Sequence, residues 1–303
     1  MRQDVVIVGG GPAGLTAAQL LRKEGLSVAV VHKGVLGGDL PNLPWVDGFP
    51  QAGARTRGAQ AAATFIRSAE DAGARFVLGE AVALEHYSRS VVVVLDGHRA
   101  IQSQAVVLAT GRRKKALDAD LGRFEGRGLI ACTACDAGFY RGQTVVVAGG
   151  GMAGALDALQ LADHAGRVVL VERGNALGCM EPLAQRVRAH PTIEVRLNAA
   201  VTGASGTAAL EAVDIRNADG ECASLPATGL SVQVGHAPDS AFVQPSVALD
   251  ADGFVDADAR MRADAPRVFA IGDVRTGSPW TVAGAVADAR AAVHALIAQF
   301  RDS

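Results

Sequence analysis

The sequence predicts an α/β fold with two Rossmann-like (βαβ) dinucleotide-binding domains, the second inserted in the first. A glycine-rich motif follows an apolar strand twice, in residues 4–14 (DVVIVGGGPAG) and in residues 144–154 (TVVVAGGGMAG), so that the copies lie 140 positions apart. Each motif opens a helix rich in alanine and leucine, and a second apolar strand follows each helix. A further apolar strand ending in Gly-Asp, in residues 268–274, precedes a long helical stretch near the C-terminus. This alternation of strand and helix is typical of parallel α/β sheets.

The composition is that of a globular chain of two domains. The 303 residues are too many for one core of ordinary size, and 49% of them are apolar while 20% are charged. A formal net charge of −2 gives no reason to expect a nucleic acid or a membrane as partner. The N-terminus lacks the pattern of a signal peptide, and the chain contains no 18-residue apolar run. We therefore expect a cytoplasmic protein.

The glycines of both motifs have the spacing that dinucleotide binding requires. The first glycine permits a tight turn, the second lets a pyrophosphate approach the backbone, and the third allows close packing of helix and strand. The N-terminus of the helix offers free N–H groups and the positive end of its dipole to the phosphates. The second strands end at His32 and Glu172, again 140 positions apart. The motif glycines are Gly9, Gly11 and Gly14 in the first copy, and Gly149, Gly151 and Gly154 in the second.

Two such sites suggest two dinucleotides, most simply a flavin and a nicotinamide. The stretch VFAIGDV at residues 268–274 supports the flavin, because an acid at such a strand end, here Asp273, can accept hydrogen bonds from the ribityl hydroxyls. The helix that follows can face the polar edge of the flavin with its N-terminus. The alternative is a strand–turn–helix connection in which Asp273 only caps or turns the chain.

Two of the four cysteines, Cys132 and Cys135, lie two residues apart in ACTACDAGFYRG, residues 131–142. Two intervening residues let a small disulfide ring close, so the pair is a candidate for redox chemistry. A structural zinc site needs four ligands, and Cys179 and Cys222 are not spaced as a second pair. We therefore predict no metal site, and an inert pair of buried cysteines is the other alternative.

In this order of motifs the chain resembles the low-molecular-weight thioredoxin reductase family of flavoproteins. The resemblance rests on GGGPAG at the N-terminus, GGDL at 37–40, ATG at 109–111, the cysteine segment, GGG at 149–151, VGHAP at 234–238 and FAIGDV at 269–274. It implies a discontinuous FAD-binding domain of residues 1–112 and 240–303. It also implies an NAD(P)H-binding-type domain of residues 113–239 that carries the cysteine pair, and a homodimeric assembly.

The resemblance also implies roles for individual residues. Cys135 would face the flavin, Cys132 would attack an external disulfide, and Asp136 would be the general acid or base for the thiols, with a helix cap as the alternative role. The residues expected to bind FAD are Gly9, Gly11, Pro12, Ala13, Gly14, His32, Lys33, Gly37, Gly38, Asp39, Leu40, Val82, Ala109, Thr110, Gly111, Gly272, Asp273, Trp280, Thr281 and Val282. Those expected to bind the second dinucleotide are Gly149, Gly151, Met152, Ala153, Gly154, Glu172 and Arg173.

The second dinucleotide site departs from the family pattern. The family reads NADPH with a His-Arg-Arg run after the second strand, where this chain has Glu172, Arg173 and Gly174. A carboxylate at that strand end repels a 2′-phosphate and suits a free 2′-hydroxyl. NADPH is therefore disfavoured and NADH fits better, unless no nicotinamide binds at all. Met152 stands where the phosphates would approach, and it either packs or crowds the cofactor.

The first site departs as well. His32 and Lys33 replace the acid common at this ribose position, and Asp39 stands where the family has glutamine. Trp280 and Thr281 replace the Arg-Gln that precedes the last helix in the family. Trp280 is either a cover for the flavin ring or an apolar side chain packed at the start of the helix.

The basic run RRKK at 112–115 lies at the domain junction, as a solvated hinge or as a docking site for an acidic protein.

The expected function is an FAD-dependent disulfide oxidoreductase that passes electrons between FAD and the Cys132–Cys135 disulfide. Its partner would be a thioredoxin-like protein or a small disulfide, with NADH or a non-nicotinamide donor such as ferredoxin. One alternative is a ferredoxin-linked thioredoxin reductase. Another is a dithiol oxidase that uses oxygen, against which Asp136 argues, because such oxidases often carry histidine there. A flavin-binding redox sensor without turnover is the alternative from another class.

Overall fold

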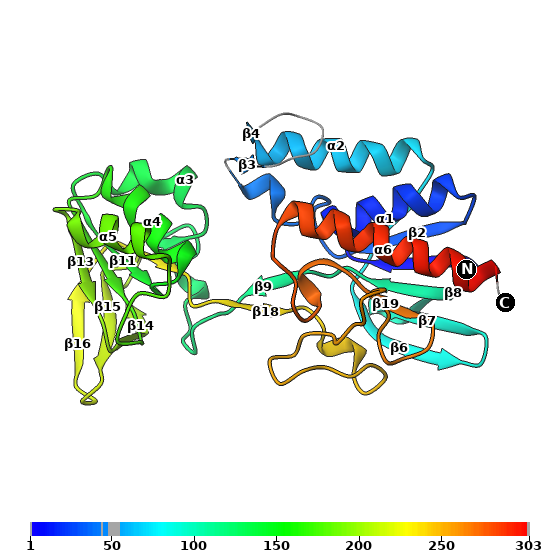
Figure 1. The fold of residues 1–303 in the computed structure, drawn as a ribbon. Helices are drawn as coiled ribbons and strands as arrows, with labels where there is room; N and C mark the ends of the chain where they lie inside the picture. The colour runs from blue at the N-terminus through cyan, green and yellow to red at the C-terminus, as the bar shows by residue number, and fades with distance from the viewer. Residues whose placement is uncertain (1, 44, 48–54, 302–303) are drawn as a thin grey trace. The chain divides into compact units, whose positions relative to one another are not determined.

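The computed structural model describes residues 2–43, 45–47 and 55–301, and the chain forms two compact units. The discontinuous unit comprises residues 1–113 and 237–303, and the inserted unit comprises residues 114–236. Figure 1 shows that each unit is built from its own sheets and helices. The sheets and helices of both units agree with the predicted α/β fold class, and the domain boundaries expected at 112/113 and 239/240 stay a prediction.

The discontinuous unit is built on a seven-stranded sheet of order β5-β2-β1-β8-β7-β6, with β19 paired to β8. Its strands β1, β2, β5, β8 and β19 run parallel, whereas β6, β7 and β8 form an antiparallel meander. The strands are β1 (Arg2–Val8), β2 (Val28–His32), β5 (Arg75–Leu78), β6 (Ala81–Tyr87), β7 (Ser90–Leu95), β8 (Arg99–Leu108) and β19 (Val268–Ala270). A separate hairpin pairs β3 (Val46–Asp47) with β4 (Arg55–Thr56).

Strand β1 is apolar on both faces because both faces are covered. Val5 and Ile7 belong to the core cluster under the helices, and Val6 and Val8 belong to the cluster on the opposite face. The helices are α1 (Pro12–Lys23), α2 (Gly58–Asp71) and α6 (Val282–Arg301), and α1 packs against both others (Figure 1). The short 3-10 turns are η1 (Leu40–Asn42), η2 (Asp96–His98), η5 (Ala241–Val243) and η6 (Gly272–Val274).

The inserted unit is built on a five-stranded parallel sheet of order β10-β17-β11-β12-β13. A three-stranded antiparallel sheet of order β14-β15-β16 completes it. Its strands are β10 (Leu129–Ile130), β11 (Thr144–Ala148), β12 (Arg167–Val171), β13 (Ile193–Arg196), β14 (Ala199–Ser205), β15 (Ala212–Asn217), β16 (Cys222–Pro226) and β17 (Gly229–Val232). Its helices and turns are α3 (Thr133–Asp136), α4 (Met152–Ala162), α5 (Glu181–Ala189), η3 (Gly122–Phe124) and η4 (Ala137–Tyr140).

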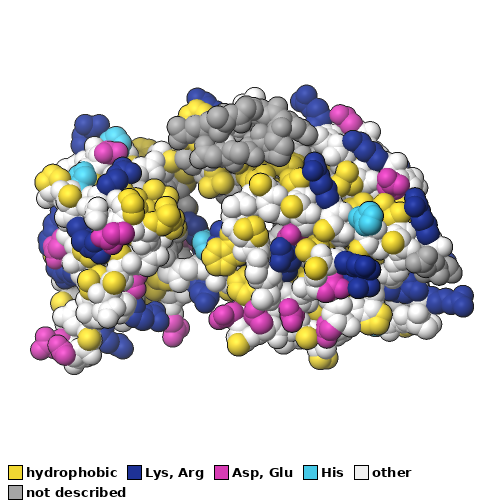
Figure 2. Space-filling model, in the orientation of Figure 1, with side chains coloured by type: hydrophobic (Ala, Val, Ile, Leu, Met, Phe, Trp, Pro, Cys, Tyr) yellow, Lys and Arg dark blue, Asp and Glu magenta, His cyan; other side chains and the backbone are white. Residues whose placement is uncertain are grey.

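The chain passes between the units through two short paired strands, β9 (Arg112–Lys114) and β18 (His236–Pro238). Among the described residues, no helix has the length and hydropathy needed to span a membrane. Figure 2 shows basic and acidic side chains interspersed over the visible surface, as the small net charge suggests.

Candidate functional site

The first glycine loop is a tight turn with one open side. Gly9 has a φ of +118°, and a Cβ there would run into the carbonyl group of Ala109. A Cβ on Gly14 would collide with the carbonyl oxygen of Gly9, so the third glycine allows α1 to pack on the turn. Gly11 differs, because the nearest atom to a Cβ there would be the Cα of Gly38, at 3.9 Å. The open side therefore lies at the middle glycine, where a pyrophosphate must approach.

The start of α1 suits an anionic ligand. Gly11 caps the helix with an extended backbone, Pro12 follows, and the first turn carries neither an acidic residue nor a side-chain cap among the described residues. The early amides of the helix and the positive end of its dipole are thus left for a ligand. Thr110 Oγ1, next to Ala109, is buried and has no hydrogen-bond partner among the described residues. The open glycine, the uncapped helix and the orphaned hydroxyl together fit the phosphate end of FAD.

The end of β2 is held mainly by protein contacts. The Nδ1 atom of His32 lies 2.7 Å from the carbonyl oxygen of Gly34, and the imidazole packs edge-on against Phe76. Lys33 donates to Asp239 at 2.7 Å and to Glu80 at 3.1 Å. The hydrogen bond to Asp239 raises the pKa of Lys33, against a lowering by partial burial. Lys33 therefore links the end of β2 to two acidic side chains, Glu80 and Asp239, through salt bridges.

Asp273, the acid expected to bind the ribityl chain, is held from both sides. Its Oδ2 accepts from Arg112 Nε at 3.0 Å, and its Oδ1 accepts from Ser278 Oγ at 3.2 Å. Trp280 lies beside this pair, with the Arg112 guanidinium 4.4 Å from the centre of its indole ring. The indole is half exposed, and it stacks loosely on Phe254 with the ring centroids 6.4 Å apart.

A buried ion pair supports the turn that carries Asp273. Asp288 of α6 is only 5% exposed, and it accepts from the Gly272 amide at 2.9 Å. Arg275 binds both oxygens of the same carboxylate, at 2.6 Å and 2.7 Å. Such a bidentate pair fixes geometry as well as charge. Sequence reasoning missed Asp288 and Arg275, because nothing near either residue in the sequence signals the contact.

The other residues expected to bind FAD lie in the discontinuous unit. Gly37 and Gly38 have positive φ angles of 98° and 61°, and Gly272 has one of 70°. Gly37, Leu40, Ala109 and Gly272 are buried, whereas Gly38, Asp39, Val82 and Thr281 are exposed and Gly111 and Val282 are half-buried. Val82 lies at an irregularity in the pairing of β6 with β7. Thr281 Oγ1 accepts from the Gly284 amide at 3.0 Å, near the start of α6.

The second glycine loop repeats the geometry of the first. Gly149 has a φ of +103°, and a Cβ there would run into the carbonyl group of Gln233, while a Cβ on Gly154 would meet the carbonyl oxygen of Gly149. No described atom would lie within 4 Å of a Cβ on Gly151. Helix α4 begins at Met152 with no acid in its first turn, and Met152 and Ala153 are exposed at its start. The loop keeps an open cradle at its middle glycine.

Glu172 turns back onto this loop. Its Oε2 accepts from the Gly150 amide at 2.5 Å, and its Oε1 accepts from the Gly174 amide at 2.7 Å. The negative charge therefore stays at the rim of the cradle, where a 2′-phosphate would be repelled. Arg173, the one arginine left of the family's run, is exposed.

The repeat extends beyond the glycine motifs. The Gly37 amide donates to the Gly10 carbonyl at 2.8 Å, and the Gly178 amide donates to the Gly150 carbonyl at 3.0 Å. The segment that includes Cys179 is thus the counterpart of the Gly-Gly segment after β2. Cys179 is half-buried beside a core cluster, and Cys222 is exposed. Among the described residues, no three His, Cys, Asp or Glu side chains gather as metal ligands.

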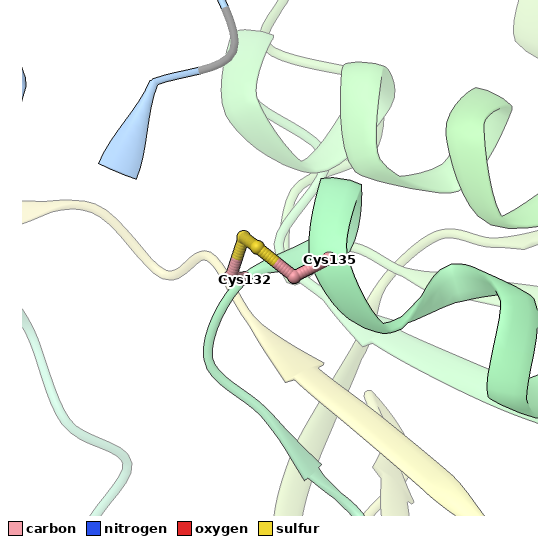
Figure 3. Close-up of a disulfide and its surroundings, with 2 residues drawn as sticks. All are labelled: Cys132 and Cys135. Atoms are coloured by element: carbon pink, nitrogen blue, oxygen red, sulfur yellow. A yellow bond between two sulfur atoms is a disulfide. The ribbon is translucent and has the colours of Figure 1, made fainter. Parts of the chain in front are cut away.

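Cys132 and Cys135 are joined by a disulfide at the start of α3, as Figure 3 shows. The Cys135 and Asp136 amides both donate to the Cys132 carbonyl at 3.0 Å, which closes the turn. Cys132 is half-buried and Cys135 is exposed. The segment follows β10, which runs parallel to β17 and β11, so the disulfide and the second glycine loop lie at the same edge of the sheet. Helix α3 also packs against α4.

Asp136 lies at the end of α3, where its side chain makes no capping hydrogen bond within the described part of the chain. Burial and the negative charge of Asp136 raise the pKa of Tyr140, whose ring fills the space in front of Gly229. Sequence reasoning missed a second acid, Asp157 of α4, which accepts from Ser231 Oγ and Gln233 Nε2 at 2.7 Å each. It ties α4 to the end of β17, beside the glycine loop.

Two glycine-loop cradles, with a disulfide at the same sheet edge as the second, are the arrangement expected of a flavoprotein disulfide oxidoreductase. The chain belongs to the pyridine nucleotide-disulphide oxidoreductase family, whose model matches residues 3–289. It is 30% identical to the thioredoxin reductase of Treponema pallidum over 96% of this chain and 95% of that protein. It is 28% identical to that of Listeria monocytogenes over 94% of this chain and 90% of that protein.

Solved structures show the same fold. Lactococcus lactis thioredoxin reductase superposes with a TM-score of 0.89 at 25% identity, covering 99% of this chain and 100% of its own. The enzyme of T. acidophilum superposes with a TM-score of 0.85 at 28% identity, covering 98% of each chain. The predicted fold class, the family resemblance and the assignment as an FAD-dependent disulfide oxidoreductase are thereby confirmed.

Proposed function

We propose that the chain reduces a disulfide of a thioredoxin-like protein. The observation that carries this proposal is the Cys132–Cys135 disulfide, placed at the same sheet edge as the second glycine loop. The relatives with the same overall fold are named thioredoxin reductases, and one relative, from Mycobacterium leprae, is a bifunctional thioredoxin reductase/thioredoxin. By the resemblance we also expect a cytoplasmic homodimer.

FAD would be held by the residues of the discontinuous unit. The open glycine at Gly11, the free amides at the start of α1 and the Thr110 hydroxyl fit its phosphates, and Asp273 fits its ribityl hydroxyls. Bound there, FAD supplies the two-electron chemistry that links the donor to the disulfide. The remaining chemistry belongs to residues of the inserted unit.

Reduction of the pair leaves two thiols on the protein. The Cys132 thiolate attacks one sulfur of the partner's disulfide, so that a mixed disulfide forms and the partner's second sulfur leaves as a thiolate. The Cys135 thiolate then attacks Cys132 in the mixed disulfide, so that the Cys132–Cys135 bond forms again and the partner departs with two thiols. Asp136, next to Cys135 in sequence, is the group we assign to carry the protons between these sulfurs.

NADH is the nicotinamide that suits the inserted unit. The Glu172 carboxylate lies at the rim of the cradle and is fixed there by the Gly150 and Gly174 amides. A 2′-phosphate brought to this rim would meet a negative charge, whereas a ribose hydroxyl can donate to the carboxylate. Arg173 is the one basic side chain that the family's run leaves at this strand end.

Anaerobic titration of the FAD-loaded protein with NADH and with NADPH tests the donor. The bleaching of the visible flavin absorbance is followed in the native protein and in Glu172→Gln. The matched control is Glu221→Gln, which removes an exposed carboxylate between β15 and β16 of the same unit. We expect NADH to reduce the native protein at a lower concentration than NADPH does. In Glu172→Gln, the concentrations of NADH and NADPH needed for reduction should lie closer together. Preferential reduction by NADPH would contradict the role of Glu172. Reduction by dithiothreitol but by neither nucleotide would contradict a nicotinamide donor and favour a donor protein such as ferredoxin.

A further inference from the structure

Arg112 differs from the three basic residues that follow it in the run at 112–115. Residues 113–115 are exposed, but the side chain of Arg112 is only 19% exposed. Its Nε donates to Asp273 at 3.0 Å, across 161 positions of sequence. A solvated hinge does not describe this residue, because its guanidinium is withdrawn from water and paired with a carboxylate.

Trp280 covers the guanidinium of this pair. The indole lies 4.4 Å from the guanidinium carbon, a distance typical of a cation–π contact. The Trp280 backbone has a φ of +54°, a left-handed conformation that costs energy for a bulky residue. Its amide donates to Ser278 Oγ, and Ser278 Oγ donates to Asp273. The loop thus holds Trp280 in a strained position that shields the ion pair from solvent.

We infer that Arg112 is a positioning residue of the FAD site. It acts through Asp273, because its guanidinium offsets the negative charge of this carboxylate beside the flavin. The inference rests on the assignment of FAD to this unit. Arg112 directly follows Gly111 and pairs with Asp273, and both of these residues belong to the expected flavin site. The Asp273 carboxylate of η6 thus meets Arg112 of β9, which is distant in sequence, and Ser278 of the loop that follows η6.

The balance of charge matters because reduction of a flavin changes its charge. Two electrons and one proton taken up by the oxidised ring leave one additional negative charge on it. An uncompensated carboxylate nearby would oppose that charge and lower the reduction potential, and the Arg112 guanidinium offsets the carboxylate. Both side chains are partly buried, so salt screens them less than exposed charges.

The two charges can be tested separately in the FAD-loaded protein. We would measure the two-electron midpoint potential and the FAD dissociation constant in Arg112→Gln, in Asp273→Asn, in the double variant, and in Arg113→Gln as a control that removes an exposed charge from the same run. We expect Arg112→Gln to shift the oxidised-to-reduced equilibrium about tenfold toward oxidised flavin, which is about 30 mV for a two-electron couple. Asp273→Asn should shift the potential in the opposite direction, and the double variant should return close to the native value.

A merely structural role would give another pattern, in which both single variants weaken FAD binding and the double variant is weaker still. That pattern, or an unchanged potential in both single variants, would overturn the inference. Arg112→Lys, which keeps the charge, supplies a second test if Arg112→Gln fails to fold, because it should keep a potential near the native one. If the native protein bound no FAD, the cofactor assignment itself would fall, which is distinct from failure of the charge balance alone.

Discussion

Glycines of one motif serve different purposes, and the space around each shows which. A Cβ on Gly14 would collide with the carbonyl oxygen of Gly9, whereas a Cβ on Gly11 would come no closer than 3.9 Å to any described atom outside its chain neighbours. Gly14 is thus required by the fold of the unbound protein. At Gly11 the protein itself has room for a side chain, so only a ligand that approaches the loop requires a glycine there.

This difference predicts opposite behaviour for two alanine variants. Gly14→Ala should lose about 1–3 kcal/mol of stability without FAD, because the turn must move to admit the methyl group. Gly11→Ala should lose less than about 1 kcal/mol without FAD, since alanine is only a poorer cap than glycine. It should nevertheless weaken FAD binding at least tenfold. Urea unfolding of the apoprotein and a fluorescence titration with FAD check both, and native-like FAD binding by Gly11→Ala would contradict the cradle.

At the scale of elements, one carboxylate near the amino ends of β1 and β2 joins these two strands to the middle of β8. Asp4 of β1 accepts from the Ser27 amide at 2.8 Å, from the Ser27 hydroxyl at 2.6 Å and from Gln104 of β8 at 2.7 Å. Ser27 directly precedes β2, so the carboxylate fixes the register of β1 against both neighbours. Partial burial would raise the pKa of Asp4, but the hydrogen bonds from Ser27 and Gln104 outweigh it and hold the pKa below 3.8.

The lowered pKa predicts how stability depends on pH. The ionised carboxylate stabilises the fold above pH 3.8, and this contribution is lost as the pH falls through the lower pKa of the folded state. Asp4→Asn should therefore cost about 1 kcal/mol at pH 7, a value reduced for partial exposure. The difference from the native protein should shrink below pH 3.8. Urea unfolding between pH 7 and 3 measures this, with Asp71→Asn at an exposed position as the control. A difference that stays constant with pH would contradict the interpretation.

Local sequence was enough to predict the glycine turns, their helices and the cysteine segment, because the residues that form each of them are close in the chain. The network around Asp273 could not be predicted in this way. Arg112 meets Asp273 across 161 positions, and its neighbours in RRKK look alike in sequence. The Glu172 contacts escaped prediction for another reason: the sequence places an acid at the strand end but does not say that backbone amides hold it.

At the scale of the whole molecule, the two units carry different parts of the proposed reaction. Each has its own buried cores, and each repeats the same glycine loop. The residues that fit FAD lie in the discontinuous unit, and the disulfide lies in the inserted unit at the same sheet edge as the second glycine loop. We expect electrons to leave the molecule through this disulfide.

A single-turnover transfer to an oxidised thioredoxin-like protein tests whether electrons take this route. The FAD-loaded protein is reduced anaerobically, mixed with the partner, and the partner's new thiols are counted by mass after alkylation. The native protein should leave the partner with both of its thiols, Cys135→Ser should trap it as a mixed disulfide through Cys132, and Cys132→Ser should do neither. Transfer by Cys132→Ser at the native rate, or no transfer by the native protein, would contradict the account.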